Sequence, residues 1–536
     1  SIASGGNYNT VVGDEAGTAL TTGDNNVAVG FEALKTEDAH GQNVAVGYRA
    51  LKTLNAAGDA HNTAVGNLAG EDVTTATANT LIGSLSGMNL TTGGSNTALG
   101  YNSLEVDTAG SRTVAIGFNA LQAQNFSSAT TSYNTAVGYN SGLLVTTGTQ
   151  NTLIGYQSGT ALTDADFNVA LGTNALASDT QGSKSTAIGT QALNTQNFSS
   201  ATDSHNTAVG YQAGLNLTTG IENTLIGGSA GSSLTDADYN VVIGKSALAS
   251  DTKGSRSVAI GFGALDTQNF TSSTDNYNVA VGFNAGTAVT TGTKNVFIGG
   301  LTGDATVDSA DNTAVGYNAL GGGDSGGTNT AIGSGALGSA TGYDNTAVGM
   351  IAGANVTSGY NNLFLGHDAG ITGSPGGNHV AANNNIVLGD ENIAIFNAQV
   401  SLTVASDERD KTDFTALDIG LDFVNDLKPY TYKWDKRSKY GDKTADDYDL
   451  NAQTPDGTHK EDWLDIGFKA QEVETLEVAE GYKKEDKTNL LITMTEDGKQ
   501  YGMRYEKFVP ILVKALQELS TKNDALEARI KILEGE

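Results

Sequence analysis

The stretch TVASDERDKTDF, residues 403–414, carries the side chains most suited to chemistry. Six charged residues fall within 407–413, directly after Ser406. A serine hydroxyl becomes a useful nucleophile when a base takes its proton, and a lysine can be that base if burial or nearby cations lower its pKa. Taken alone, however, Ser-Asp-x-Arg is more typical of a helix N-cap followed by acidic first-turn residues. Features elsewhere in the sequence are needed to distinguish a nucleophile with its base from a helix cap.

The charged stretch lies at a change of composition. Residues 1–405 hold 9 Lys+Arg and 29 Asp+Glu, whereas residues 406–536 hold 20 and 30. A sparsely charged segment therefore meets a densely charged one, and this shift predicts a domain boundary. We place a repeat region at 1–391, a neck at 392–405 and a C-terminal domain at 406–536.

The composition excludes several classes of function. The net charge of −30 argues against nucleic acid as a partner and against attraction to anionic membranes. No apolar run approaches the roughly 20 residues that a membrane span requires. There is no cysteine, and the six histidines show no helical pairing, so we expect neither metal nor cofactor.

The first segment repeats one short phrase, Asn-(Thr/Val)-apolar-(Val/Ile/Leu)-Gly, 22 times, most often at 17-residue steps. Every fourth copy carries a larger third residue, which gives a slower period of 72 residues: Leu81, Leu153, Leu225 and Phe297. Strict repetition at this step predicts a parallel β-solenoid with one short strand per turn. The glycine after each strand predicts a bend or a close backbone approach.

Two adjacent apolar positions in every copy, such as Ala64 and Val65, point to opposite faces of the strand. One face can fill the solenoid interior. The other face needs a cover, and we expect a second chain in a symmetric oligomer. The alternative is a monomeric solenoid whose own loops cover this face.

The phrases NTAVGYNAL (312–320) and NTAIGSGAL (329–337) resemble the head repeats of trimeric autotransporter adhesins, and similar repeats occur in phage tail fibres. The resemblance implies a trimer of parallel β-rolls. Since these repeats are longer than those of the adhesins, each turn should carry a larger outer loop, where such a rod would place recognition.

The second segment has the pattern of an α+β domain. LDFVNDLKPYTYKWD (421–435) predicts a helix that ends before Pro429 and then a strand, and DWLDIGFKAQEVETL (462–476) predicts a strand and a short helix. Residues 392–405 alternate polar and apolar and predict a short β neck. The final helix, about 510–534, has a heptad seam that predicts a coiled coil, and three chains fit the expected rod. The alternative is an amphipathic helix packed on its own domain. The seam consists of Leu512, Leu516, Leu519, Asn523, Leu526, Ile530 and Leu533.

Residues 406–536 resemble the C-terminal intramolecular chaperone of phage tail spikes and fibres, the type first recognised in endosialidases. The matching stretches are SDERDK (406–411), LKPYTYKW (427–434), GFKAQEVE (467–474), YEKFVPILVKALQEL (505–519) and the terminal coiled coil. Asp410 departs from the family, in which leucine is common.

The resemblance implies that the domain trimerises, templates folding of the fibre and then cuts itself off. By analogy the cut falls between Ala405 and Ser406, with Ser406 as nucleophile, Lys411 as its base, and Asp407 and Arg409 in support. Attack within one chain and attack from a neighbouring chain both remain open.

These features predict a virion tail-fibre or tail-spike protein, a homotrimeric rod for host attachment. Its partners would be a host cell-surface receptor, glycan or protein, and other virion tail proteins. The alternatives are a polysaccharide-degrading spike enzyme, with loop acids such as Asp164/Asp166 and Asp236/Asp238 as candidates, and a bacterial surface adhesin. The repetition of those acids suggests a structural role.

Overall fold

A computed structural model describes residues 5–400, 402–443, 445 and 447–535. The chain divides into two compact units, 1–318 and 319–536. The first unit consists of repeats alone. The second contains the last four repeat strands and the C-terminal region. Of the expected neck, residue 401 lies outside the described residues.

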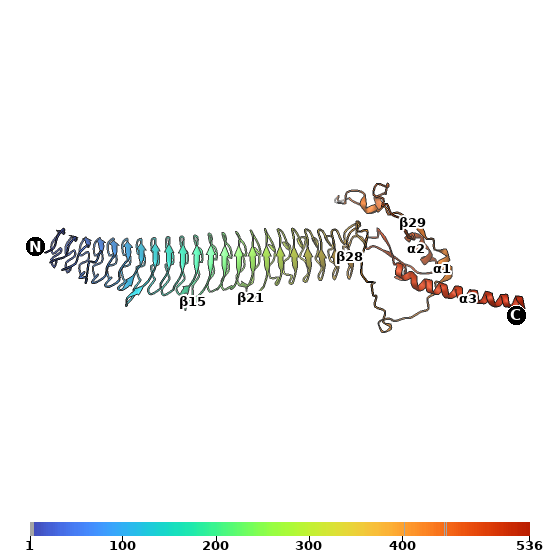
Figure 1. Cartoon of the computed structure of the whole chain (residues 1–536), viewed down its shortest axis with the longest axis horizontal. Coiled ribbons are helices and arrows are strands. Elements are labelled where there is room, and N and C mark those ends of the chain that lie inside the picture. Colours follow the sequence, from blue (N-terminus) through green and yellow to red (C-terminus); the bar gives the residue numbers. More distant parts are fainter. Residues whose placement is uncertain (1–4, 401, 444, 446, 536) are drawn as a thin grey trace. The chain divides into compact units, whose positions relative to one another are not determined.

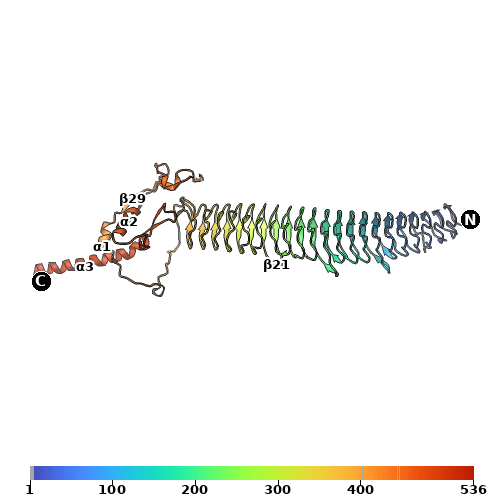
Figure 2. The same cartoon turned by 180° about the vertical axis from the view of Figure 1, so that it is seen from behind.

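The first unit is a parallel β-solenoid, which confirms the expected fold class. Figure 1 shows its strands as a regular stack from blue to green, and Figure 2 shows the same stack from behind. Each strand pairs in parallel with the next, as in Ala64 opposite Leu81. The stacked strands are β1 (Thr10–Val12), β2 (Val27–Val29), β3 (Val44–Val46), β4 (Thr63–Val65), β5 (Thr80–Ile82), β6 (Thr97–Leu99), β8 (Val114–Ile116), β10 (Thr135–Val137), β11 (Thr152–Ile154), β12 (Val169–Leu171), β14 (Thr186–Ile188), β16 (Thr207–Val209), β17 (Thr224–Ile226), β18 (Val241–Ile243), β20 (Val258–Ile260), β22 (Val279–Val281), β23 (Val296–Ile298) and β24 (Thr313–Val315).

The second unit begins with four more parallel strands of the same type, β25 (Thr330–Ile332), β26 (Thr346–Val348), β27 (Leu363–Leu365) and β28 (Ile386–Leu388). A small α+β region follows, with the helices η1 (Glu408–Asp410), α1 (Leu421–Asp426), η2 (Arg437–Lys439), η3 (Leu450–Ala452), α2 (Ala470–Ala479), η4 (Tyr505–Lys507) and α3 (Phe508–Glu534). Its strands form two antiparallel pairs, β29 (Tyr430–Tyr432) with β30 (Asp465–Gly467), and β31 (Ile492–Met494) with β32 (Tyr501–Met503).

Two positions share the filling of the solenoid core: the middle residue of each strand and the corner residue that packs on it. When one is large, the other is small. The middle residue of each strand from β2 onward is buried. Where that residue is large, as in Leu81, the left-handed corner residues that pack on it are glycines, Gly70 and Gly87. Where that residue and its counterpart in the next turn are both alanine, as in Ala98 and Ala115, the corner between them holds a buried leucine, Leu104, with φ +52°. The large residues at 72-residue spacing are thus explained by packing.

Asparagines just before the strands form a buried ladder through the stack. The Oδ1 atom of Asn62 accepts the backbone N–H of Asn79 at 3.0 Å, and its Nδ2 donates to the carbonyl of Ala76 at 2.8 Å. The same two bonds recur from turn to turn, for example on Asn79. Because a buried amide without partners would be costly, this ladder strongly favours asparagine at that position.

The outer face of the strands is not covered by the chain's own loops. The first and third strand residues point outward, and the third is a partly exposed Val, Ile or Leu; Leu99 and Leu171 are both 42% exposed. The alternative of a solenoid whose own loops cover this face is therefore not realised in the described residues. These outward apolar residues follow one another along the stack in a strip, which we call the outer strip and define as the third residues of the stacked strands from β2 to β24.

The predicted β neck is corrected by the structure. The described residues of 392–405 contain no strand, because a strand needs a hydrogen-bonded partner and a single chain offers none there. The alternating apolar residues of this segment are instead highly exposed: Ile393, Ile395, Phe396, Val400, Leu402 and Val404.

The C-terminal region confirms the other expected elements. Helix α1 ends before Pro429, β29 and β30 pair, and α2 follows β30. Their shared core consists of Ile419, Phe423, Val473, Leu491, Ile492, Phe508 and Ile511. The polar segment 436–461 is mostly loop, with η2 and η3 within it.

Candidate functional site

The charged stretch forms one turn of 3-10 helix, η1, and Asp407 is its N-cap. The Asp407 carboxylate accepts the backbone N–H of Arg409 at 2.9 Å. The helix-cap interpretation of the sequence is therefore realised, but by the residue after the serine. Ser406 stays outside the turn, which leaves its hydroxyl available for another partner.

That partner is Lys411. The turn brings residue 411 back to residue 406, so that Lys411 Nζ lies 2.6 Å from Ser406 Oγ and 3.3 Å from the Ser406 carbonyl oxygen. A lysine amine at hydrogen-bonding distance from a serine hydroxyl is the geometry that a general base and its nucleophile require. The structure thus brings together the two residues that the sequence analysis paired.

Asp407 and Arg409 form a two-point ion pair, with Nη2–Oδ2 at 2.6 Å and Nε–Oδ1 at 3.0 Å. The hydrogen bonds from Arg409 lower the pKa of Asp407, and the carboxylate in turn raises the pKa of Arg409. Because Arg409 is engaged by Asp407, it holds the turn closed and does not act as a free cation beside Lys411. The side-chain contacts of Asp407 and Arg409 thus join these two residues to each other within the turn, and their support of the Ser406–Lys411 pair stays a prediction.

The whole segment 405–413 is exposed to solvent. A lysine accepts a proton only in its neutral form, and desolvation is the usual way to favour that form. A single chain does not supply this desolvation. The serine and the lysine are therefore at the right distance, but both are exposed to water. Another protein surface would have to exclude this water for efficient chemistry.

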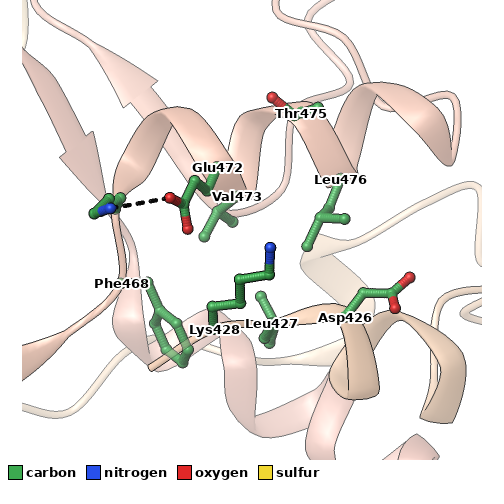
Figure 3. Close-up of a pocket in the computed structure, with 9 residues that line it drawn as sticks. Asp426, Leu427, Lys428, Phe468, Glu472, Val473, Thr475 and Leu476 are labelled. Carbon is green, nitrogen blue, oxygen red and sulfur yellow. Dashed lines mark hydrogen bonds and ion pairs between the residues drawn. The ribbon is translucent and has the colours of Figure 1, made fainter. Parts of the chain in front are cut away.

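The C-terminal region also contains a pocket, shown in Figure 3, that the Ser406–Lys411 pair does not line. It measures about 200 Å³ between the end of α1 and helix α2. Val473, Leu476 and Phe468 line its apolar side, and Lys428 extends into it from below α2 (Figure 3). Glu472, at its rim, forms an ion pair with Lys469 at 3.1 Å. Its lining includes neither Ser406 nor Lys411.

The heptad seam is a single exposed row on α3. Each apolar seam residue is at least 48% exposed, and Asn523 is exposed as well, donating to Glu527 at 3.0 Å. Only the start of α3 packs on its own domain, through Phe508, Ile511 and Ala515. The alternative of an amphipathic helix packed on its own domain therefore fails for most of its length, and the seam is open to other helices.

The aspartates of the repeat loops, proposed above as candidates for a glycosidase site, make hydrogen bonds within the solenoid. Asp166 Oδ1 accepts the backbone N–H of Thr149 at 2.6 Å, and Asp238 Oδ1 accepts that of Ile221 at 2.8 Å. One aspartate of each pair is thus committed to the neighbouring turn, which favours the structural interpretation of both.

Two groups of histidine and acidic residues have ligand atoms close together, Glu37 with Asp38 and His40, and His367 with Asp368 and Asp390. In the first group Glu37 already accepts the backbone N–H groups of His40 and Ala56, at 3.0 and 3.2 Å. This carboxylate therefore has a structural role in its own turn.

Sequence analysis missed two acidic residues that organise the C-terminal region. Glu518 on α3 accepts the N–H of Leu421 at 2.8 Å and thereby caps α1. The buried Glu477 accepts the N–H groups of Leu490 and Ile492, at 2.9 and 3.2 Å, where β31 begins. Neither contact has a local sequence signal, because the partners are far apart in the chain.

Within the described residues, no helix combines the length and apolar character needed to cross a bilayer.

Residues 406–482 match the Peptidase_S74 family model, described as the chaperone of endosialidase. The match begins at Ser406, the first residue of the serine–lysine pair. No curated protein and no solved structure matches the chain.

Proposed function

We propose that the chain is a tail-fibre or tail-spike protein of a virus, a homotrimeric rod that attaches the virion to its host. Its C-terminal domain would template folding and then release itself by cleavage between Ala405 and Ser406. The observation that carries this proposal is the position of the Ser406–Lys411 pair at the first residues of the chaperone match, directly after the neck that follows the repeat rod.

The cleavage is an acyl transfer. Lys411 takes the proton of Ser406 Oγ, and the oxygen attacks the carbonyl carbon of Ala405. The C–N bond to the Ser406 nitrogen breaks, and that nitrogen takes a proton, which leaves an ester between Ala405 and a serine hydroxyl. Water then hydrolyses the ester, giving a carboxylate on Ala405 and restoring the hydroxyl. The same proton transfer serves attack within one chain or from a neighbour.

Three exposed apolar surfaces support the trimer: the outer strip, the neck and the heptad seam. Apolar surface of this extent is unusual in a monomer and marks interfaces. Residues 406–413 directly follow the neck in the chain, so that chains packed together along the neck would also approach this segment. Assembly would then supply the desolvation that the single chain lacks.

The test is expression of the wild type beside Ser406→Ala and Lys411→Met. On a denaturing gel the wild type should give fragments of 405 and 131 residues, whereas both variants should remain as one chain of 536. Lys433→Met, a change of the same kind outside the pair, is the control and should cleave normally. An uncut wild-type chain would overturn self-cleavage and leave the domain as a permanent trimerisation cap.

A further inference from the structure

Three loops of the solenoid share one design. Between β8 and β10, β14 and β16, and β20 and β22 the step lengthens from 17 to 21 residues. The added residues form loops at 125–131, 197–203 and 269–275. Each loop is closed by a two-residue parallel sheet, β7 (Gly110–Ser111) with β9 (Thr130–Thr131), β13 (Gly182–Ser183) with β15 (Thr202–Asp203), and β19 (Gly254–Ser255) with β21 (Thr274–Asp275). Figure 1 places β15 and β21 at the same edge of the stack.

Buried anchors hold the loops in one conformation. Asp107 accepts the N–H groups of Gly110 and Phe126 at 3.0 and 3.1 Å and the Gln124 side-chain amide at 2.6 Å. The Phe126 ring is buried below the loop. Asp179 and Asp251 make the same three contacts in the other two loops. Such preorganisation reduces the entropy lost when a surface binds a ligand.

The three loops present similar groups to solvent. Its tip carries two exposed hydroxyls: Ser127 and Ser128, Ser199 and Ser200, or Thr271 and Ser272. A cation follows the first strand of each closing sheet, and a ring follows the second strand: Arg112 and Tyr133, Lys184 and His205, and Arg256 and Tyr277. In the first loop Arg112 donates to the Tyr133 hydroxyl at 3.2 Å, and in the third the Arg256 guanidinium lies 5.9 Å from the Tyr277 ring centre.

The charge of the three copies differs in one respect. Lys184 pairs with Asp203 at 2.5 Å, and Arg256 pairs with Asp275 at 3.0 Å. Thr131 replaces this aspartate in the first loop. At this position the first loop therefore has one acidic group fewer than the other two.

We propose that the three loops are equivalent binding sites for one repeating polysaccharide on the host surface. Hydroxyls, a tyrosine or histidine ring and a cation are groups that bind sugars and acidic sugars through adaptable hydrogen bonds and ring contacts. The copies are 72 residues apart, which at one turn per strand spacing is about 19 Å. A polysaccharide repeats along its length and can occupy all three sites, whereas a folded protein receptor has no such repeat. This inference rests on host attachment as the proposed function.

The test uses the full-length protein and a panel of bacterial cells. A strain that adsorbs the wild type is then treated with periodate, which destroys glycans, or with protease. The variants replace the tip hydroxyls by alanine in one loop (Ser127→Ala with Ser128→Ala), in two loops, and in all three. Since the loops act together, we expect about 10-fold weaker adsorption for one loop and at least 100-fold for three.

The control is the triple variant Thr147→Ala, Thr219→Ala and Thr291→Ala. These exposed threonines are also 72 residues apart, in corners on neighbouring turns, and the control should adsorb like the wild type. If protease treatment of the cells abolishes adsorption and periodate treatment does not, the ligand of the loops is a protein receptor and the polysaccharide proposal is wrong. Unchanged adsorption of the three-loop variant would overturn the loops as the site. Failure to adsorb to any strain would instead overturn host attachment, and this inference with it.

Discussion

Gly66 lies directly against Gly83 of the next turn. A Cβ atom on Gly66 would stand 2.3 Å from the Gly83 carbonyl oxygen, and Gly66 has φ +149°, a conformation that side chains rarely adopt. The glycine after each strand thus allows both the bend and the backbone contact that the repeat predicted.

We expect Gly66→Ala to destabilise the rod by at least about 1–3 kcal/mol, because it adds backbone strain to the close contact. The measurement is chemical denaturation followed by circular dichroism. Gly58→Ala is the matched control, since a Cβ there meets no atom within 4 Å. Equal denaturation midpoints for the two variants would show that the close contact between Gly66 and Gly83 does not restrict the residue at position 66.

Because the strand middle and the corner fill the core together, two substitutions at these positions should offset each other's loss of stability. Leu81→Ala leaves a cavity and should cost about 2–5 kcal/mol. Gly87→Leu adds a side chain only 2.8 Å from Leu81 Cδ2 and should cost about 1–3 kcal/mol. The double variant recreates the arrangement of Ala98 and Leu104 and should recover most of the loss. A double-mutant cycle measures this coupling, and simple additivity of the two losses would contradict it.

The Glu518 cap predicts a pH dependence of the C-terminal domain. The Leu421 N–H, followed by Lys514, lowers the pKa of Glu518 below its ordinary value of 4.5. Because the folded pKa is the lower one, the stabilising contribution is fully present above pH 4.5 and is lost as the pH falls through the folded value. Glu518→Gln should remove this part of the acid sensitivity.

The domain's unfolding midpoint, followed from pH 7 to pH 3, tests that expectation. Glu527→Gln, an exposed change on the same helix without a cap role, is the control and should behave like the wild type. Parallel profiles for the wild type and Glu518→Gln would mean that this cap contributes nothing.

The exposed seam predicts that assembly and cleavage depend on the same helix. Leu526→Asp places a charge in the seam, whereas Ala528→Asp places it on the opposite side of α3. Sedimentation should show a trimer for the control and smaller species for Leu526→Asp. Since the Ser406–Lys411 pair is uncovered in a single chain, cleavage should also slow in Leu526→Asp. Normal cleavage by a monomeric variant would show that the pair needs no cover.

The repeat was predictable because its structure is local and periodic. Each strand, its buried middle residue and its glycine follow from one phrase. The C-terminal helices and strands also carry local signals, such as Pro429 after α1. The Ser406–Lys411 contact was predicted only through family resemblance, since the residues alone favoured a helix cap.

Other features depended on contacts that sequence patterns do not reveal. Asp407 became the cap instead of Ser406 because its carboxylate reaches the N–H of Arg409. Glu518 and Leu421 meet across 97 residues of chain. The neck pattern does suit a strand, but strand formation requires a partner that one chain does not contain.

The asparagine ladder makes the two ends of the rod chemically different. Both side-chain bonds of Asn62 are made with residues that follow it, Ala76 and Asn79. If turns are added toward the N-terminus, each new side-chain amide is paired at once, and the backbone N–H of the same asparagine waits for the preceding turn. If turns are added toward the C-terminus, the backbone N–H is paired at once and the side-chain amide waits for the next turn. The two ends of the rod therefore differ in chemistry, with a backbone donor unpaired at one end and a side-chain amide unpaired at the other.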